Sequence, residues 1–248
     1  MTMDYNNYFR NRGTVRSYTE RKLSDTELSQ MLDAAAHAPN TGNMQWYSAI
    51  ITRSDEGKKA LLEPHFNQLQ VENAQAVITF CLDLLRFEMW CRSNNAEPGF
   101  ENFQSFIAAI IDTSIFAQQF CTIAEMNGLG TCYLGTTTYN APAIATALCL
   151  PERVVPVTTV TVGFPTEAAK PSWRLPVDAI MHFERYDIPT TNQIRQWYTP
   201  LEIESAHFVE ENSRQTLAQV FTDIRYPRES AEYFSKVYHD FLFKNKFT

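Results

Sequence analysis

Runs of apolar and polar residues along the chain predict helices and strands in alternation. The longest run, Gln104 to Asn127, is apolar on nearly every side, which is typical of a helix buried in a large core or against a partner. Gly128 follows as the expected helix end, because glycine adopts the left-handed cap conformation without penalty. The segment from Gly128 to Thr136 is then expected to form a short strand edged with glycine and hydroxyl residues. We expect the rest of the chain to be arranged around this helix and strand.

Shorter patterns place further elements on both sides of it. Ser24 and Glu27 form the sequence of a capping box before an amphipathic helix that ends near Ala38. Strands are expected at Trp46–Thr52, Ala76–Leu82 and Val154–Gly163, with an edge strand at Ala179–Tyr186; helices are expected at Asp55–Leu62 and, capped by Asn140, up to about Cys149. The chain is polar and helical from Thr190 onward. We therefore predict an α+β fold in one domain, residues 1–248, with a core at about 10–187 and a C-terminal helical extension at about 188–248.

Composition narrows the class of protein. Of the 248 residues, 44% are hydrophobic and 20% are charged, as in ordinary globular proteins. A net charge of −7 without a dense Lys or Arg run argues against nucleic acid and membrane partners. The five cysteines form no CxxC pair and are expected to be reduced thiols, and no signal peptide is visible. The long apolar run carries acidic and amide side chains and is expected not to span a bilayer. A cytoplasmic protein is predicted.

Two basic segments far apart in the chain are candidates for phosphate binding. Arg12, Thr14 and Arg16 lie near the start, and Lys170 and Arg174 lie in a proline-braced loop. Arginine forks suit phosphate oxygens, although for any one of these residues alone an ordinary solvated surface charge is the default interpretation. The turn Pro39–Asn43 offers amide and hydroxyl groups suited to the edge of a flat heterocycle, or it simply ends a helix.

Several kinds of active site are not indicated by the sequence. Gly128-Leu129-Gly130 follows a predicted helix instead of a strand, so the order of elements excludes a dinucleotide-binding fingerprint. The five histidines lack metal-ligand spacing, and no metal site is predicted. No pair of nucleophile and base is indicated, so no side chain is assigned as catalytic. Chemistry is expected to come from a bound organic cofactor.

In order and spacing, four segments resemble those of the nitroreductase family of FMN enzymes, most closely its NADPH-dependent, oxygen-insensitive branch. They are Arg12–Arg16 with Tyr18, Ala38–Trp46, Gly128–Gly135 and Lys170–Pro176. The likeness covers roughly Arg12 to Tyr186. It implies a nitroreductase-like fold with a central mixed or antiparallel sheet flanked by helices and a long central helix at a dimer interface.

The resemblance also implies roles for individual residues. Arg12, Lys170 and Arg174 would hold the FMN phosphate, with Gly13 and Thr14 beside them. Arg16 would lie by flavin N1 and the C2 carbonyl, where negative charge develops on reduction. Pro39, Asn40, Thr41 and Asn43 would reach the partner's flavin, Gln68 would approach the pyrimidine edge, and Tyr133, Leu134, Gly135 and Thr136 would follow the ring, with a backbone N–H near Gly135 directed at N5. Arg214 would contact the NADPH 2′-phosphate.

Two departures from the family pattern stand out: Gly13 replaces a more usual Arg or His, and the loop between Lys170 and Arg174 is longer.

The predicted protein is a homodimeric NAD(P)H oxidoreductase that uses FMN in a ping-pong reaction. Its electron donor would be NADPH or NADH, and its acceptor a small molecule such as a nitroaromatic or a quinone. Three alternatives stay open at this stage: a flavin reductase that supplies reduced FMN to a partner, a flavin-binding protein without turnover, and an α+β binding domain without flavin.

Overall fold

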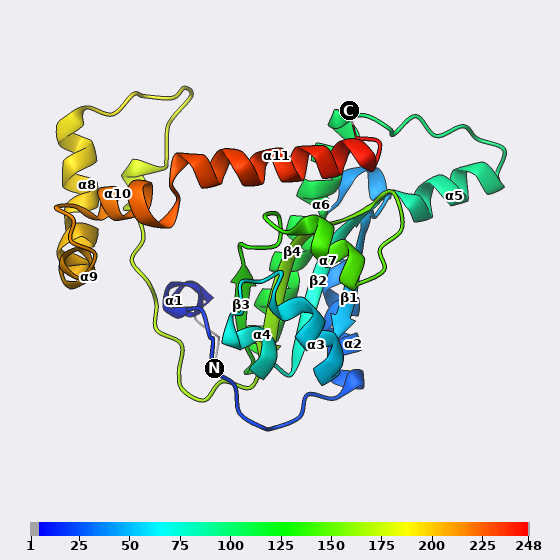
Figure 1. Ribbon diagram of the computed structural model, residues 1–248, viewed down its shortest axis with the longest axis horizontal. Coiled ribbons are helices and arrows are strands. Elements are labelled where there is room, and N and C mark those ends of the chain that lie inside the picture. Colours follow the sequence, from blue (N-terminus) through cyan, green and yellow to red (C-terminus); the bar gives the residue numbers. More distant parts are fainter. Residues whose placement is uncertain (1–4, 248) are drawn as a thin grey trace. The chain divides into compact units, whose positions relative to one another are not determined.

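A computed structural model describes residues 5–247 (Figure 1). The chain forms two compact units. One contains the residues up to Lys170 and those from Phe234 onward, and the other contains Pro171–Tyr233. The prediction of a single domain, with a core at about 10–187 and a C-terminal helical extension at about 188–248, stays a prediction.

The larger unit is built on a four-stranded antiparallel sheet. Its strands are β1 (Tyr47–Thr52), β2 (Ala76–Asp83), β3 (Gly130–Leu134) and β4 (Val154–Gly163), in the order β1-β2-β4-β3. Every residue of β2 is buried, as expected for an interior strand with a continuous apolar run. The predicted α+β fold with an antiparallel sheet and a long central helix is confirmed.

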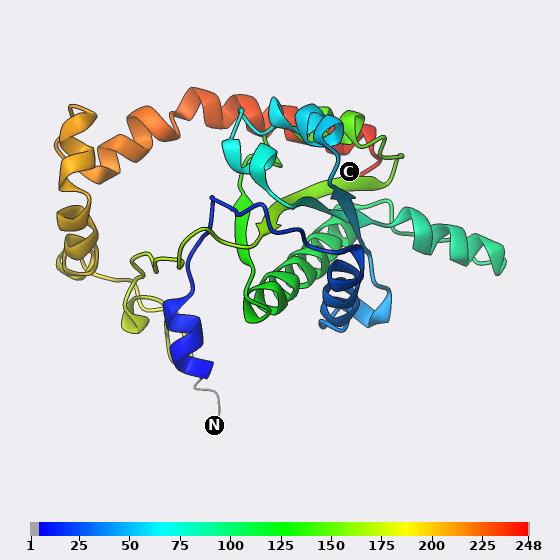
Figure 2. The same ribbon diagram turned by 90° about the horizontal axis from the view of Figure 1, so that it is seen from below.

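Helices cover both faces of this sheet (Figure 2). The helices α2 (Asp25–Ala36) and α6 (Phe103–Met126) lie on one face; α3 (Asp55–Leu62), α4 (Leu69–Asn73) and α7 (Ala141–Ala147) lie on the other. The capping box predicted for α2 is present, since Ser24 Oγ accepts from the Glu27 N–H and Glu27 accepts from the Ser24 N–H. Side chains of α2 and α6 join those of the sheet in the main core, where Phe80 contacts Phe116 and Phe120.

The central helix α6 combines a buried face with an apolar exposed face. Phe103 and Ile111 are 60% and 51% exposed on it. By length and composition α6 could cross a membrane, since its most apolar window has a hydropathy of 1.5, but 44% of that window is buried inside the protein. The core helix of a soluble protein passes the same test. Gly128 ends the helix with φ +78, which confirms the predicted left-handed stop.

Other helices of this unit were not foreseen. These are α1 (Tyr5–Asn11), α4 and α5 (Leu85–Ser93). The helix α7 forms where predicted, but Asn140 does not cap it through its side chain. Its amide instead donates to the Pro64 carbonyl at 2.7 Å, because the loop before α4 passes within reach.

The smaller unit is helical. It contains η2 (Val177–Ala179), α8 (Thr191–Glu204), α9 (Ala206–Glu211), α10 (Leu217–Val220), η3 (Phe221–Arg225) and the first residues of α11 (Arg228–Lys244). Val209, Leu217 and Val220 form its buried centre. The remainder of α11 belongs to the larger unit, where Tyr238 contacts Phe106.

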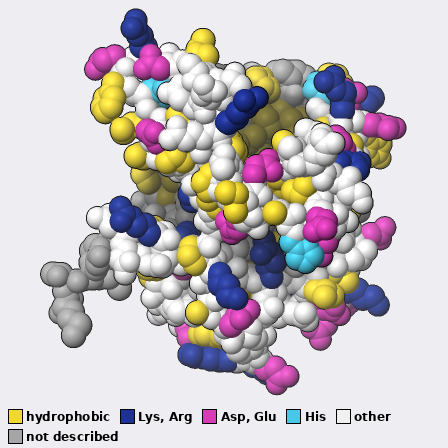
Figure 3. All heavy atoms as spheres, turned by 90° about the vertical axis from the view of Figure 1, so that its left-hand side faces the viewer, with side chains coloured by type: hydrophobic (Ala, Val, Ile, Leu, Met, Phe, Trp, Pro, Cys, Tyr) yellow, Lys and Arg dark blue, Asp and Glu magenta, His cyan; other side chains and the backbone are white. Residues whose placement is uncertain are grey.

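The edge strand predicted at Ala179–Tyr186 is wrong. The segment begins at the last residue of the short helix η2 and forms no strand, and Ile180 and Phe183 are exposed. Its apolar residues satisfy the pattern of a strand, but no neighbouring strand accepts its backbone hydrogen bonds. Apolar side chains also lie among charged ones over the face of the molecule seen in Figure 3.

Candidate active site

The N-terminal basic segment is held along the edge strand of the sheet. The Val15 N–H donates to the Thr131 carbonyl of β3 at 3.0 Å, and the Thr19 N–H donates to the Phe164 carbonyl at 2.8 Å. A side chain at Gly130 would place its Cβ 2.5 Å from that of Val15, so the close approach requires glycine on β3. This contact fixes where Thr14 and Arg16 lie.

Residues of the two basic segments meet in the larger unit. Thr14, Arg16 and Lys170 line one cavity of about 260 Å³, together with Ser17, Glu167 and the backbone between them. The contact is close, because a Cβ at position 13 would lie 2.2 Å from the Lys170 carbonyl oxygen. The late loop therefore leaves no space for a side chain at position 13.

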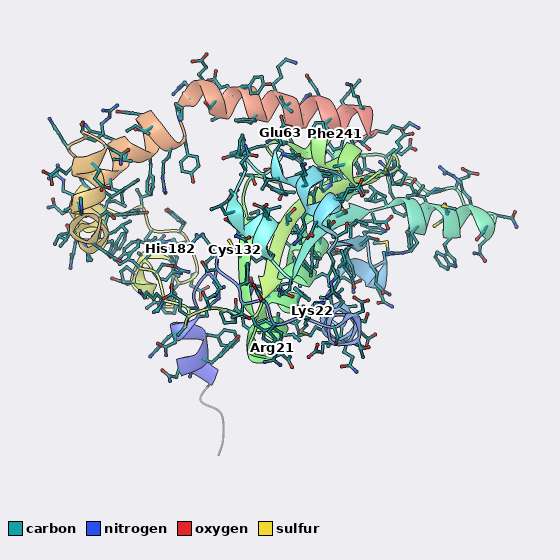
Figure 4. The ribbon with its side chains drawn as sticks, turned by 60° about the horizontal axis from the view of Figure 1, so that its bottom comes forward. Arg21, Lys22, Glu63, Cys132, His182 and Phe241 are labelled. Carbon is teal, nitrogen blue, oxygen red and sulfur yellow. The ribbon has the colours of Figure 1, made fainter. Side chains whose placement is uncertain are left out.

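Arg16 also lies beside β3. Burial raises the pKa of the Cys132 thiol, and the neighbouring Arg16 guanidinium and Gln70 amide offset part of that effect. Cys132 lies on β3 (Figure 4). Arg16 itself is exposed, and it is one of the residues that line the cavity.

Arg12 has a partner within the protein. Its Nε and Nη2 donate to the two oxygens of Glu125 on α6, at 3.2 and 2.7 Å. Thr131 Oγ1 donates to the same carboxylate at 2.6 Å. This ion pair uses two of the five N–H groups of the guanidinium. The role of Arg12 as a phosphate ligand stays a prediction.

The end of β3 presents bare main chain. Leu134 is buried, whereas Tyr133 and Gly135 are exposed. Gly135 has no left-handed φ, and a Cβ built on it meets nothing within 4 Å. Neither backbone conformation nor a neighbour in the described chain requires glycine here, in contrast to Gly13 and Gly130. Open space beside an exposed backbone is what a planar ligand lying against this edge requires.

The residue after Gly135 belongs to a network of polar groups. Thr136 Oγ1 lies 2.8 Å from His65 Nδ1 and 3.3 Å from the donating Gln68 Nε2. Gln68 also donates to the His65 carbonyl at 3.0 Å and accepts from Gln70 at 2.7 Å. Both N–H bonds of the Gln68 amide are thus used within the protein, and its predicted contact with a pyrimidine edge stays a prediction. The structure adds His65 to the site, with a pKa that burial lowers to about 4.

The turn after α2 is exposed and closely fixed. Pro39, Asn40, Thr41 and Asn43 lie in or beside the short helix η1 (Thr41–Asn43). Thr41 is bonded to Asp112 of α6 through both its N–H and its hydroxyl, each at 2.9 Å. In the sequence, Asp112 is one of two acidic residues in the apolar run Gln104 to Asn127, and an acidic residue in such a run is the signal that could have found it.

The two remaining candidates belong to the smaller unit. Arg174 Nη1 donates to the carbonyl and hydroxyl of Ser172, at 3.2 and 2.7 Å, and so bonds its own loop. Arg214 pairs with Asp223 at 3.1 Å. Their predicted contacts with phosphate groups stay predictions. Among the residues that the structure describes, no group of three or more His, Cys, Asp and Glu side chains is placed to hold a metal ion.

Comparison with known proteins identifies the family. The profile of the Nitroreductase family matches residues 9–164. The chain belongs to the nitroreductase family. It is 29% identical over 182 residues, 73% of each chain, to the FMN reductase (NADPH) of Bacillus subtilis strain 168. It is also 29% identical over 178 residues to the Cr(VI) reductase of Pseudomonas sp. strain G-1, covering 72% of this chain and 73% of that protein.

A solved structure matches this chain over almost its full length. A protein of Bacteroides fragilis NCTC 9343, named only as a candidate oxidoreductase, is 44% identical with a TM-score of 0.95, over 97% of this chain and 98% of the other. The resemblance inferred from the four sequence segments is confirmed at the level of family and fold.

Proposed function

We propose that this nitroreductase-family protein is an FMN-dependent NAD(P)H oxidoreductase, working in the cytoplasm as a homodimer. The observation that carries the proposal is the exposed main chain at Gly135, at the end of the strand β3 beside which Arg16 lies. The names of its relatives, FMN reductase (NADPH) and Cr(VI) reductase, support the same class of reaction. The chemistry that bound FMN supplies is hydride acceptance at N5 and delivery of two electrons to a small acceptor such as a nitroaromatic or a quinone.

The residues of the chain would bind and orient the cofactor. Arg16 would place a fixed positive charge beside the ring, where it favours the negative charge that accompanies reduction. Lys170 and Thr14 would contact the phosphate end, since a cation and a hydroxyl suit phosphate oxygens. The Gly135 backbone would lie against the ring and direct an N–H toward it. No side chain is needed as a dedicated acid, because solvent can supply protons.

The exposed face of α6 supports the homodimer. Phe103, Ile111, Ile115 and Met126 present apolar surface on one long helix. Apolar surface of this kind on a core helix is typical of obligate interfaces. In such a dimer the turn Asn40–Asn43, which α6 holds through Asp112, would contribute to the partner's cofactor site.

The visible spectrum of the purified protein, reconstituted with FMN if necessary, tests the function. We expect a flavin spectrum that anaerobic NADPH bleaches and that a quinone then restores. A protein that binds no FMN would overturn the proposal. A bound flavin that NADPH cannot bleach would leave only a flavin-binding protein, and loss of reduced FMN into solution during turnover would favour a flavin reductase.

Substitution of Gly135 tests the placement of the cofactor. We expect Gly135→Val to raise the Kd for FMN by about a hundredfold with little change in Tm, because the new side chain enters space open in the protein but needed by the ring. Gly99→Val is the matched control, since Gly99 is exposed and a Cβ there also meets nothing within 4 Å. Unchanged FMN affinity in Gly135→Val would remove the β3 edge from the site.

A further inference from the structure

The exposed turn between α2 and β1 has an unusually constrained backbone. Gly42, Asn43 and Gln45 have φ values of 55, 57 and 53, all in the left-handed region. Residues other than glycine rarely adopt this conformation, and it persists where the surroundings impose it. A solvent-exposed turn would ordinarily relax, so its shape must be fixed by contacts from the body of the protein.

The contact from the core side is Asp112. This residue of α6 is 1% exposed, and its Oδ1 accepts from both the N–H and the hydroxyl of Thr41, each at 2.9 Å. On the other side of the turn, the Arg86 guanidinium donates to the carbonyls of Gln45, at 2.6 Å, and Tyr47, at 3.0 Å. The turn is thus held at both ends by charged groups.

Burying the Asp112 carboxylate costs more folding free energy than is needed to close a turn. Its Oδ2 is buried and has no hydrogen-bond partner in the described part of the chain. A buried carboxylate with one oxygen unpaired destabilises the folded state, and a neutral acceptor could hold Thr41 without that cost. What the carboxylate adds is strength, because hydrogen bonds to an ionised acceptor are about twice as strong as neutral ones. This favours a role in which the turn must not move.

We propose that Asp112 is a positioning residue: by holding Thr41 it fixes the turn Asn40–Asn43 in the shape that contacts FMN. The inference rests on the proposed function and adds a residue to it. Asp112 does not itself touch the cofactor. Because Asp112 belongs to the central helix, its hydrogen bonds to Thr41 fix the turn relative to that helix. The affinity for FMN would therefore depend on a buried carboxylate that does not contact the cofactor.

Four substitutions separate positioning from folding. Asp112→Ala removes the acceptor, and Asp112→Asn keeps an accepting oxygen without the charge. Thr41→Val removes the hydroxyl bond alone, and Thr41→Ser retains it. The control is Thr113→Val on the same helix, because Thr113 is equally buried and its hydroxyl bonds only the Ala109 carbonyl of α6, at 2.7 Å.

The readouts are the Kd for FMN, the visible circular dichroism of bound FMN, and Tm. We expect Asp112→Ala to raise the Kd by more than about tenfold and Thr41→Val by about threefold to tenfold, with an altered dichroic band. Thr41→Ser is expected to restore most of the affinity lost in Thr41→Val. Asp112→Asn is expected to restore only part of the affinity lost in Asp112→Ala, because its neutral oxygen accepts a weaker hydrogen bond. The double substitution Asp112→Ala/Thr41→Val is expected to cost less than the sum of the two. Thr113→Val is expected to lower Tm without changing the Kd or the band.

The two levels of the proposal fail in different ways. If the wild-type protein binds no FMN, the proposed function is overturned. If wild-type protein binds FMN and the folded Asp112→Ala and Thr41→Val variants bind it equally well, only the role of Asp112 is overturned. Should Asp112→Ala not fold, the comparison of Thr41→Val with Thr41→Ser decides alone, and equal affinity in that pair rejects the role.

Discussion

His65 is a histidine that burial keeps neutral beside the candidate site. Its pKa is lowered from 6.5 to about 4, its Nδ1 lies 2.8 Å from Thr136 Oγ1, and its Nε2 is buried without a partner in the described residues. Because the folded pKa lies below the unfolded one, falling pH protonates the unfolded chain first. The stabilisation from neutral His65 is therefore complete above pH 6.5 and is lost as pH falls toward 4.

Unfolding in urea between pH 7 and pH 4 measures this effect. The shift in pKa corresponds to about 3 kcal/mol of unfolding free energy lost over that range. The variant His65→Asn keeps an amide near Thr136 and cannot titrate, so we expect a correspondingly flatter pH profile. The control is His207→Asn, since the His207 side chain is 84% exposed. Identical profiles for wild type and His65→Asn would contradict the assignment.

At the scale of single residues, the sequence indicated which kinds of side chain are candidates for the site, but not which partners those side chains bond. One cavity brings Thr14, Arg16 and Lys170 together, and the predicted roles of these and the other candidate residues toward a cofactor stay predictions. Their hydrogen-bond partners were not predictable, because Arg12 pairs with Glu125 and Thr41 with Asp112 across more than seventy residues. Such pairings depend on the tertiary fold, which local patterns do not contain.

Helices and strands with strong periodicity were predicted to within a few residues. The helices α2, α3 and α6 and the strands β1, β2 and β4 lie where apolar spacing and capping residues place them. The prediction failed at Ala179–Tyr186, where the pattern had no partner strand, and it missed short helices such as α4 and α5. A strand is completed by its neighbour, whereas a capped amphipathic helix satisfies most of its own backbone.

One buried residue fastens the C-terminal end of α11 to the core. Arg153 donates to Glu88 from Nε at 3.0 Å, and its Nη1 donates to the carbonyls of Asn245, at 3.3 Å, and Lys246, at 3.1 Å. The Phe247 ring lies 4.3 Å from the guanidinium carbon. Since both Arg153 and Glu88 are buried, removal of one leaves the other charge uncompensated.

Substitution of this pair has an expected order of effects. Arg153→Met is expected to lower the free energy of unfolding by about 3–5 kcal/mol, and adding Glu88→Leu to recover part of it. Lys246→Met is the control, because the ion pair of Lys246 with Glu152 is exposed and contributes at most about 1 kcal/mol. Urea unfolding measures the free energy of unfolding of all three variants. An Arg153→Met variant as stable as Lys246→Met would show that the contacts of Arg153 contribute little to stability.

At the scale of the whole molecule, the proposed dimer makes each site depend on two subunits. Arg16 would act on the cofactor of its own subunit, and the turn Asn40–Asn43 on that of the partner. A dimer mixed from Arg16→Ala subunits and Asn40→Ala/Asn43→Ala subunits would then carry both defects in one site and none in the other.

Refolding the two variants together, with orthogonal tags to isolate the mixed species, measures this dependence. Each variant alone is expected to bind FMN weakly, and the mixed dimer to regain about one tightly bound FMN. The control is each tagged variant refolded with itself. A mixed dimer without any restored site would place the turn and Arg16 in the same subunit's site, and a monomer in solution would exclude the arrangement.

The contact between Gly13 and the main chain of Lys170 constrains any exchange of segments with relatives. A larger residue at position 13, brought in by transplanting an N-terminal stretch, would collide with the carbonyl of the late loop and push apart the walls of the cavity. Chimaeras that swap both segments from the same donor are expected to retain the cavity, whereas those that swap one are expected to distort it. The segments that contain Gly13 and Lys170 therefore have to be exchanged together in any redesign.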